Sequence, residues 1–200
     1  MRPRQWAFLG MIGIVSILSG CGEFVVSPRY VSQDIVDPEI SQGAAIKLVV
    51  RDERMDKDVV GVTEDTYKRP IRLNRPAPQI MEEGFRQALT ETNWVVSETA
   101  EFTCQVTLLE VKLVWSAKFS SNFEARVSLN VAVLNKGRHL GVRRVTEQGW
   151  QANKLTSNKE LEGGHCLSVV LSRAIDKAVS DKSLFALLRA TNQQKQSPSN

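Results

Sequence analysis

Histidine and cysteine are scarce in this chain of 200 residues, which holds two histidines and three cysteines. Neither His139 nor His165 belongs to an HExxH motif, and no GxSxG or CxxC sequence occurs. Metalloprotease, serine-hydrolase and dithiol-oxidoreductase sites therefore lack the residues that define them. Gly163-Gly164 is not followed by Lys-Ser or Lys-Thr, so a phosphate-binding loop is missing too. We expect no catalytic residue, metal site or cofactor, and interpret His139 as a turn residue and His165 as the start of a helix.

A strong excess of one charge is also missing. The 26 basic and 22 acidic residues give a net charge of +4, and the two signs are mixed along the chain. Binding to nucleic acid requires a basic patch or stripe with stacking aromatic residues, so we expect no nucleic-acid partner. A hydrophobic content of 42% and a charged content of 24% are typical of a globular protein, and the length suits one domain with short appendages.

Long hydrophobic runs are absent, since a membrane-spanning helix needs roughly 20 apolar residues in succession. A shorter uncharged run, Trp6 to Leu18, follows Arg2 and Arg4 at the amino terminus. A basic start followed by a short apolar run is the pattern of a secretory signal peptide. The alternative, a buried core helix, fits less well with the terminal position of this run.

The signal-like run ends in Leu18-Ser19-Gly20-Cys21, which resembles the lipobox of bacterial lipoproteins. The resemblance implies cleavage after Gly20, a diacylglyceryl thioether on Cys21 and a third acyl chain, such as palmitate, on the new amino terminus. Stable anchoring in a membrane requires more than one such chain. Ordinary cleavage, which would leave Cys21 as a free thiol, is the alternative. Removal of Arg2 and Arg4 lowers the net charge from +4 to +2.

Gly22 follows Cys21 where an Asp would commonly retain a lipoprotein in the inner membrane. Its presence implies transport to the periplasmic face of the outer membrane of a Gram-negative bacterium. Cys104 and Cys166 are then the two remaining cysteines in a compartment that permits disulfides. We consider them a candidate disulfide, with two separately buried thiols as the alternative.

The chain divides into four parts by composition. We assign residues 1–20 to the signal peptide, 21–43 to the lipidated amino terminus and a tether, 44–190 to a periplasmic domain and 191–200 to a flexible polar tail.

Periodicity within the domain predicts strands and helices in alternation. We expect strands at 45–51, 102–116, 123–133 and 140–152, and helices at 79–93 and, after a break at Gly163-Gly164, at 165–181. Residues 52–58, rich in carboxylates, lack the ligand pattern of a calcium loop and are interpreted as a solvated loop. Residues 69–78 are interpreted as a connection punctuated by prolines. The predicted fold class is α+β, a single domain in which helices pack on one face of an antiparallel or mixed sheet.

The mature chain resembles the YajG-like family of uncharacterised bacterial lipoproteins. The resemblance rests on LSGC at 18–21, VVSP at 25–28, AIKLVVRDER at 45–54, the helix before NWVV at 93–96 and DKSLFALL at 181–188. It implies an outer-membrane lipoprotein without an assigned activity.

Together these features predict a non-enzymatic binding or envelope-assembly module, held in the membrane by the lipid on Cys21 and bound to an envelope protein. Trp115 and Phe119 are the candidate interaction surface, and the alternative is that they cover the edge of the core. An auxiliary lipoprotein of an envelope lipid or solute transport system is the second hypothesis. An enzyme that acts on the cell wall is the third.

Overall fold

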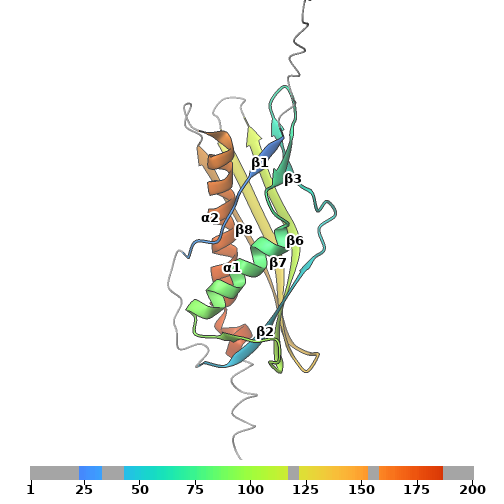
Figure 1. The fold of residues 1–200 in the computed structure, drawn as a ribbon, viewed down its shortest axis with the longest axis vertical. Helices are drawn as coiled ribbons and strands as arrows, with labels where there is room; N and C mark the ends of the chain where they lie inside the picture. Colours follow the sequence, from blue (N-terminus) through green and yellow to red (C-terminus); the bar gives the residue numbers. More distant parts are fainter. Residues whose placement is uncertain (1–22, 33–42, 117–121, 153–157, 187–200) are drawn as a thin grey trace, which may run out of the picture.

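The computed structural model describes residues 23–32, 43–116, 122–152 and 158–186. It contains eight strands and two helices among these residues (Figure 1). Their bounds are β1 Phe24–Val26, β2 Ala45–Asp52, β3 Val59–Glu64, β4 Pro70–Leu73, α1 Ala77–Glu91, β5 Val95–Val96, β6 Phe102–Ser116, β7 Asn122–Asn135, β8 Arg138–Ala152 and α2 Lys159–Val179.

The strands form one mixed sheet around β6. On one side, β6 pairs with β7 along its whole length, and β7 pairs with β8, both antiparallel. On the other side, β2 runs parallel to the first half of β6 and β3 runs parallel to its last residues. β4 joins β3 in antiparallel orientation, while β1 runs parallel to β4 and β5 parallel to β2.

The α+β single-domain class is confirmed, but an antiparallel description covers only the long meander β6–β7–β8. Four of the seven strand pairings are parallel. Parallel neighbours require a crossover connection, and the chain makes one through α1 between β2 and β6. The sequence-based prediction missed β1, β3 and β4, and so missed two of the four parallel pairings.

The core lies between the sheet and the two helices. α1 and α2 lie on the same face of the sheet, and Figure 1 shows both helices in front of it. A β-bulge between Leu108 and Glu110 shifts the register of β6, so the buried alternation changes phase there. The largest fully buried side chains include Phe85, Phe123, Phe185, Leu129, Leu167 and Ile175.

Helix α2 begins earlier than the sequence predicted, and the expected break at Gly163-Gly164 is wrong. Asn158 caps the helix by accepting hydrogen bonds from the backbone nitrogens of Glu160 and Leu161. Gly163 is needed inside the helix because a Cβ there would lie 2.9 Å from Cε1 of Phe123. The glycine pair therefore lets α2 approach the sheet closely and does not end the helix.

Two segments predicted to be irregular are structured instead. Residues 70–73, placed in the proline connection, form β4, where Pro70 opens the strand and no ladder donor is lost from its interior. Residues 24–32, placed in the tether, contain β1 and pack against α2. Among the described residues, the first strand therefore begins at Phe24 and not at Ala45.

Candidate functional site

The described chain begins two residues after the predicted lipidation residue. Cys21 lies outside the described residues, and the first described side chain, Glu23, forms an ion pair with Arg72 (Oε1 to Nε, 3.3 Å). Phe24, the next residue, opens β1 and pairs with Ile71. The sheet thus begins three residues after Cys21.

Residues 27–32 continue from β1 and lie in extended form along α2. The backbone nitrogen of Arg29 donates to Oγ of Ser168 (3.0 Å), and that of Val31 donates to Oγ of Ser172 (2.9 Å). Residues i and i+4 lie on the same face of a helix, and alternate backbone nitrogens of an extended segment point the same way. The two serines are therefore spaced to receive two alternate nitrogens of the segment.

Two further features of the packing involve Ser27 and Tyr30. A Cβ at Gly164 would lie 3.4 Å from the backbone nitrogen of Ser27, so the absence of a larger side chain allows close approach. The hydroxyl of Tyr30 donates to Oδ1 of Asp176 (2.6 Å). Burial, together with this hydrogen bond, raises the pKa of Tyr30 above its usual value. We call residues 24–32 the N-terminal strap.

The strap and the first turns of α2 line an open groove of about 760 Å³. Its lining includes Val25, Arg29 and Val31 from the strap and Leu161 and His165 from α2. Val31 and Leu161 are exposed apolar side chains there. Glu160 lines the groove as well. This mixture of apolar, basic, acidic and imidazole groups suits binding of an amphipathic ligand better than a defined chemical step.

The candidate disulfide does not form, because both thiols are free and buried. Cys104 pairs with Val133 near one end of β7, whereas the Sγ of Cys166 lies 3.8 Å from the carbonyl oxygen of Phe123 near the other. At ~3.4 Å per residue the two sites are ~34 Å apart along the strand, whereas a disulfide requires Cα atoms within about 7 Å. Burial raises the pKa of Cys104 to about 12 and that of Cys166 to about 11.

Trp115, one of the two residues of the predicted interaction surface, is a core residue with 4% exposure. Its ring stacks on Phe24 (centroids 6.5 Å apart), and the Nζ of Lys159 lies 4.0 Å from the ring centroid. Trp115 therefore joins β1, β6 and α2 and is not available to a partner. Phe119 lies outside the described residues.

Trp150 is the strongly exposed tryptophan among the described residues, at 75%. It lies on β8, on the sheet face opposite the helices: its neighbour Gly149 faces Val170 of α2. Val142, on the same face of β8, is 59% exposed. The sequence indicates this position through the two-residue period of the strand. Trp150 shares its strand face with the polar Thr146 and Gln148, and not with apolar residues.

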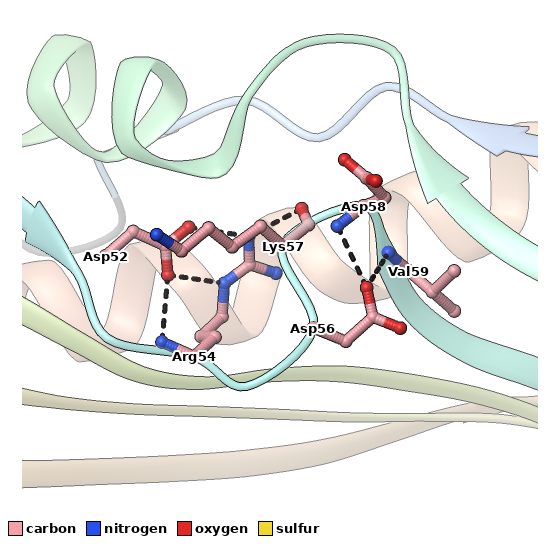
Figure 2. Close-up of polar contacts among 6 residues, drawn as sticks. All are labelled: Asp52, Arg54, Asp56, Lys57, Asp58 and Val59. Carbon is pink, nitrogen blue, oxygen red and sulfur yellow. Dashed lines mark hydrogen bonds and ion pairs between the residues drawn. The ribbon is translucent and has the colours of Figure 1, made fainter.

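The charged loop at 52–58 contains a buried ion pair as well as solvated residues (Figure 2). Arg54 donates from Nε and Nη2 to the two carboxylate oxygens of Asp52, both at 2.9 Å, and from Nη2 to the carbonyl oxygen of Lys57 at 3.0 Å. Burial alone would raise the pKa of Asp52, but the hydrogen bonds and charge of Arg54 lower it overall. The prediction of a wholly solvated loop is wrong for this pair.

The carboxylate of Asp56, in the same loop, stabilises the turn by accepting backbone hydrogen bonds. Its Oδ1 accepts from the backbone nitrogens of Asp58 (3.0 Å) and Val59 (2.9 Å), and these bonds lower the pKa of Asp56. A neighbouring hollow of about 460 Å³ is lined by Lys57, Arg72 and the residues before α1. Within the described ranges, no three histidine, cysteine, aspartate or glutamate side chains gather as a metal site would require.

The two histidines occupy regular elements and are far apart in the fold. His139 is the second residue of β8 and pairs with Leu134, so its interpretation as a turn residue is wrong. His165 lies inside α2 rather than at its start. His139 on β8 is separated from Cys104 on β6 by strand β7. His165 precedes Cys166 in α2, and the thiol of Cys166 is directed at the carbonyl oxygen of Phe123.

The model of a family described as uncharacterised lipoproteins matches residues 33–189. The chain belongs to this lipoprotein family. This match confirms the resemblance to the YajG-like lipoproteins that the sequence suggested. None of the curated proteins matches the chain.

Solved structures share the fold of this lipoprotein at low sequence identity. A DUF330-family protein from Xanthomonas campestris superimposes with a TM-score of 0.53 at 12% identity, covering 86% of this chain and 99% of that one. A minor lipoprotein from Acinetobacter baumannii gives a TM-score of 0.46 at 11% identity, covering 71% and 90%. The first likeness establishes that the fold occurs elsewhere. Among the described residues, no helix is long and apolar enough to cross a bilayer.

Proposed function

We propose that this lipoprotein is cleaved after Gly20, lipidated on Cys21 and held at the periplasmic face of the outer membrane of a Gram-negative bacterium. Membership of a lipoprotein family carries the proposal, together with the position of the lipobox cysteine three residues before the first strand. Gly22 in place of Asp supports the outer membrane over the inner membrane.

Mass spectrometry of the protein extracted from membranes tests the anchor. We expect an amino-terminal Cys21 peptide that carries a diacylglyceryl group and a third acyl chain, and we expect Cys21→Ala to leave the protein unprocessed. Gly22→Asp should move the protein to the inner-membrane fraction, whereas the matched variant Gly22→Ser should not. An unmodified Cys21, or a Gly22→Asp protein that stays with the outer membrane, contradicts the respective part of the proposal.

We further propose that the domain is a non-enzymatic module that binds an extended segment of another envelope protein along β8. β8 has 15 residues and, within the part of the chain described, pairs only with β7, so its other edge offers backbone groups to a strand. Exposed Val142 and Trp150 supply apolar contacts on this edge strand. In β8, Arg143 forms an ion pair with Asp181, and Glu147 forms one with Lys177. Arg138 and Arg144 leave the strand with positive charge, which favours a segment with acidic side chains.

A photoreactive residue in place of Gln148 tests the binding edge in intact envelopes. We expect adducts with one envelope protein, with the cross-linked peptide in an extended, acidic segment, and we expect Trp150→Ala to weaken them. The same residue in place of Lys112, exposed on β6, is the matched control. Equal yields of adduct from positions 112 and 148, or no adduct from position 148, would contradict this proposal.

The groove between the strap and α2 supports the second function, an auxiliary role in envelope lipid or solute transport. Its exposed Val31 and Leu161 could receive an acyl chain, with Arg29 beside them for an anionic head group. Mass spectrometry of lipid that co-purifies with the protein tests this role. A stoichiometric lipid that Leu161→Asp abolishes supports it, and the absence of such a lipid from the wild-type protein contradicts it.

A further inference from the structure

We infer that one end of the domain lies directly against the membrane surface, because the strap leaves almost no free chain between the lipid and the fold. The inference rests on the lipidation of Cys21 proposed above. Cys21 and Phe24 are three residues apart, which corresponds to at most ~10 Å of extended chain. A tether of the predicted length, 21–43, would have allowed several times that reach.

Strand register determines which end of the domain is held there. β1 runs parallel to β4, with Phe24 beside Ile71, so the lipid-bearing terminus lies next to the turn at residues 65–69 that precedes β4. The end of β3 lies beside the end of β6, where Glu64 pairs with Ser116. Figure 1 shows these segments together near the upper end of the molecule.

The first turn of α2 lies at the same end. Lys159 covers the ring of Trp115, which in turn stacks on Phe24. The backbone nitrogen of Val25 also lies 3.5 Å from Oε1 of Glu160. We define the anchor end as the turn at 65–69 together with residues 158–161.

The exposed side chains of the anchor end suit a lipid head-group layer. Tyr67 is 80% exposed at the tip of its turn and is followed by the exposed Lys68, while Leu161 is 72% exposed and close to the exposed Lys159. Tyrosine is enriched at the level of lipid head groups, and lysines interact with their phosphates. These residues would contact the bilayer surface once the chain from Cys21 has brought the anchor end to it.

The opposite end of the domain points away from the membrane. The turn between β7 and β8, which contains Lys136, lies at the far end of the meander. β7 has 14 residues, and at ~3.4 Å per residue it places the two ends ~45 Å apart. The sheet therefore stands upright on the membrane, and β8 extends from the head-group layer into the periplasm.

Fluorescence quenching in reconstituted vesicles tests this orientation. Lipidated protein carrying a fluorophore on Tyr67→Cys or on Lys136→Cys is placed in vesicles of phosphatidylethanolamine and phosphatidylglycerol that contain a lipid with a nitroxide head group. Cys104 and Cys166 are buried, and the protein without an introduced cysteine measures any labelling of them. We expect quenching at position 67 to exceed that at position 136 at least about threefold, because nitroxide quenching is short-ranged relative to ~45 Å.

A linker variant separates the effect of the short connection from that of the surface. Insertion of about 20 Gly/Ser residues between Gly22 and Glu23 adds a mean reach of ~25 Å. We expect the difference between positions 67 and 136 to fall to less than about half of its original value with this added reach.

The outcomes distinguish this inference from the proposed anchor. Vesicles that carry the protein but quench both positions equally overturn the orientation and leave the anchor intact. An orientation that the linker does not weaken overturns the role of the short connection. If protein purified from membranes lacks lipid on Cys21 and does not float with the vesicles, the anchor and the orientation fail together.

Discussion

The N-terminal strap and the β6–β8 meander both pack against α2, but different interactions hold them. The meander presents an apolar face with Phe123, Leu129 and Val145 buried against the helices. The strap contributes Phe24 and Val26 to the core, and its later residues are held by hydrogen bonds to Ser168 and Ser172. The meander thus stabilises the whole domain by hydrophobic burial, whereas the later strap depends on a few polar contacts that can open locally.

The largest expected loss of stability comes from the aromatic cluster that joins the two regions. Phe123 is fully buried and lies 6.2 Å from Phe24 and 6.5 Å from Trp115, measured between ring centroids. We expect Phe123→Ala to lower the free energy of unfolding by about 3–5 kcal/mol through lost burial and a cavity. Urea unfolding measures this change, with Tyr67→Ala as an exposed aromatic control. A loss below about 1 kcal/mol would contradict the placement of Phe123 in the core.

A smaller and more local effect is expected from the serines of α2. The double variant Ser168→Ala/Ser172→Ala leaves two strap nitrogens without their acceptors, and each such loss costs roughly 1 kcal/mol or more. We expect trypsin to cleave after Arg29 faster in the double variant while the core stays folded. Ser183→Ala, at an exposed position, is the control. Unchanged cleavage in the double variant would show that these hydroxyls do not hold the strap.

Tyr30 is expected to contribute less than the serine pair. Tyr30→Phe removes the hydroxyl that donates to Asp176 and keeps the ring in place. We expect a loss of about 0.5–1.5 kcal/mol, measured by urea unfolding. The variant Asp176→Asn keeps an acceptor in this position and should cost less. A larger loss from Asp176→Asn than from Tyr30→Phe would contradict the assigned donor and acceptor.

The smallest expected effect is that of a reducing agent. Because Cys104 and Cys166 are free, dithiothreitol should leave the unfolding midpoint unchanged. A disulfide between them would close a loop of about 60 residues and contribute roughly 4 kcal/mol in the chain-entropy model. Thiol titration of the denatured protein, without reductant, should detect both of these cysteines. A midpoint that falls on reduction would contradict the separation of the two thiols.

The meander could be predicted from the sequence and the strap could not, for a physical reason. Apolar alternation within β6 and β7 reports burial directly, and each strand pairs with the next one along the chain. The later residues of the strap instead find their partners more than 130 positions away, on small residues of α2 that carry no hydrophobic signal. Its prolines and weak periodicity therefore suggested a tether, and the short connection to Cys21 became evident only in the fold.

The exposure of Trp115 and of Trp150 could also be predicted only in part from the sequence. Trp115 shares its strand phase with Val111 and Leu113, both buried, so the sequence contained the evidence that it faces the core. The bulge after Leu108 hid this phase, because it reverses the alternation established by Cys104 and Val106. Trp150 could have been found from its polar neighbours on β8, whereas the separation of the cysteines required the strand register.

Amide hydrogen exchange of the strap tests most directly the claim that the fold begins three residues after Cys21. In the mature protein we expect the amides of Arg29 and Val31 to exchange slowly. The Ser168→Ala/Ser172→Ala variant should accelerate them at least about tenfold, since a loss of about 1.4 kcal/mol corresponds to a factor of ten. The amides of Val106 and Val127, in the central ladder, should keep their protection in both proteins. Exchange of Arg29 and Val31 at the rate of an unstructured chain in the wild-type protein would contradict the account and restore a free tether between the membrane and the domain.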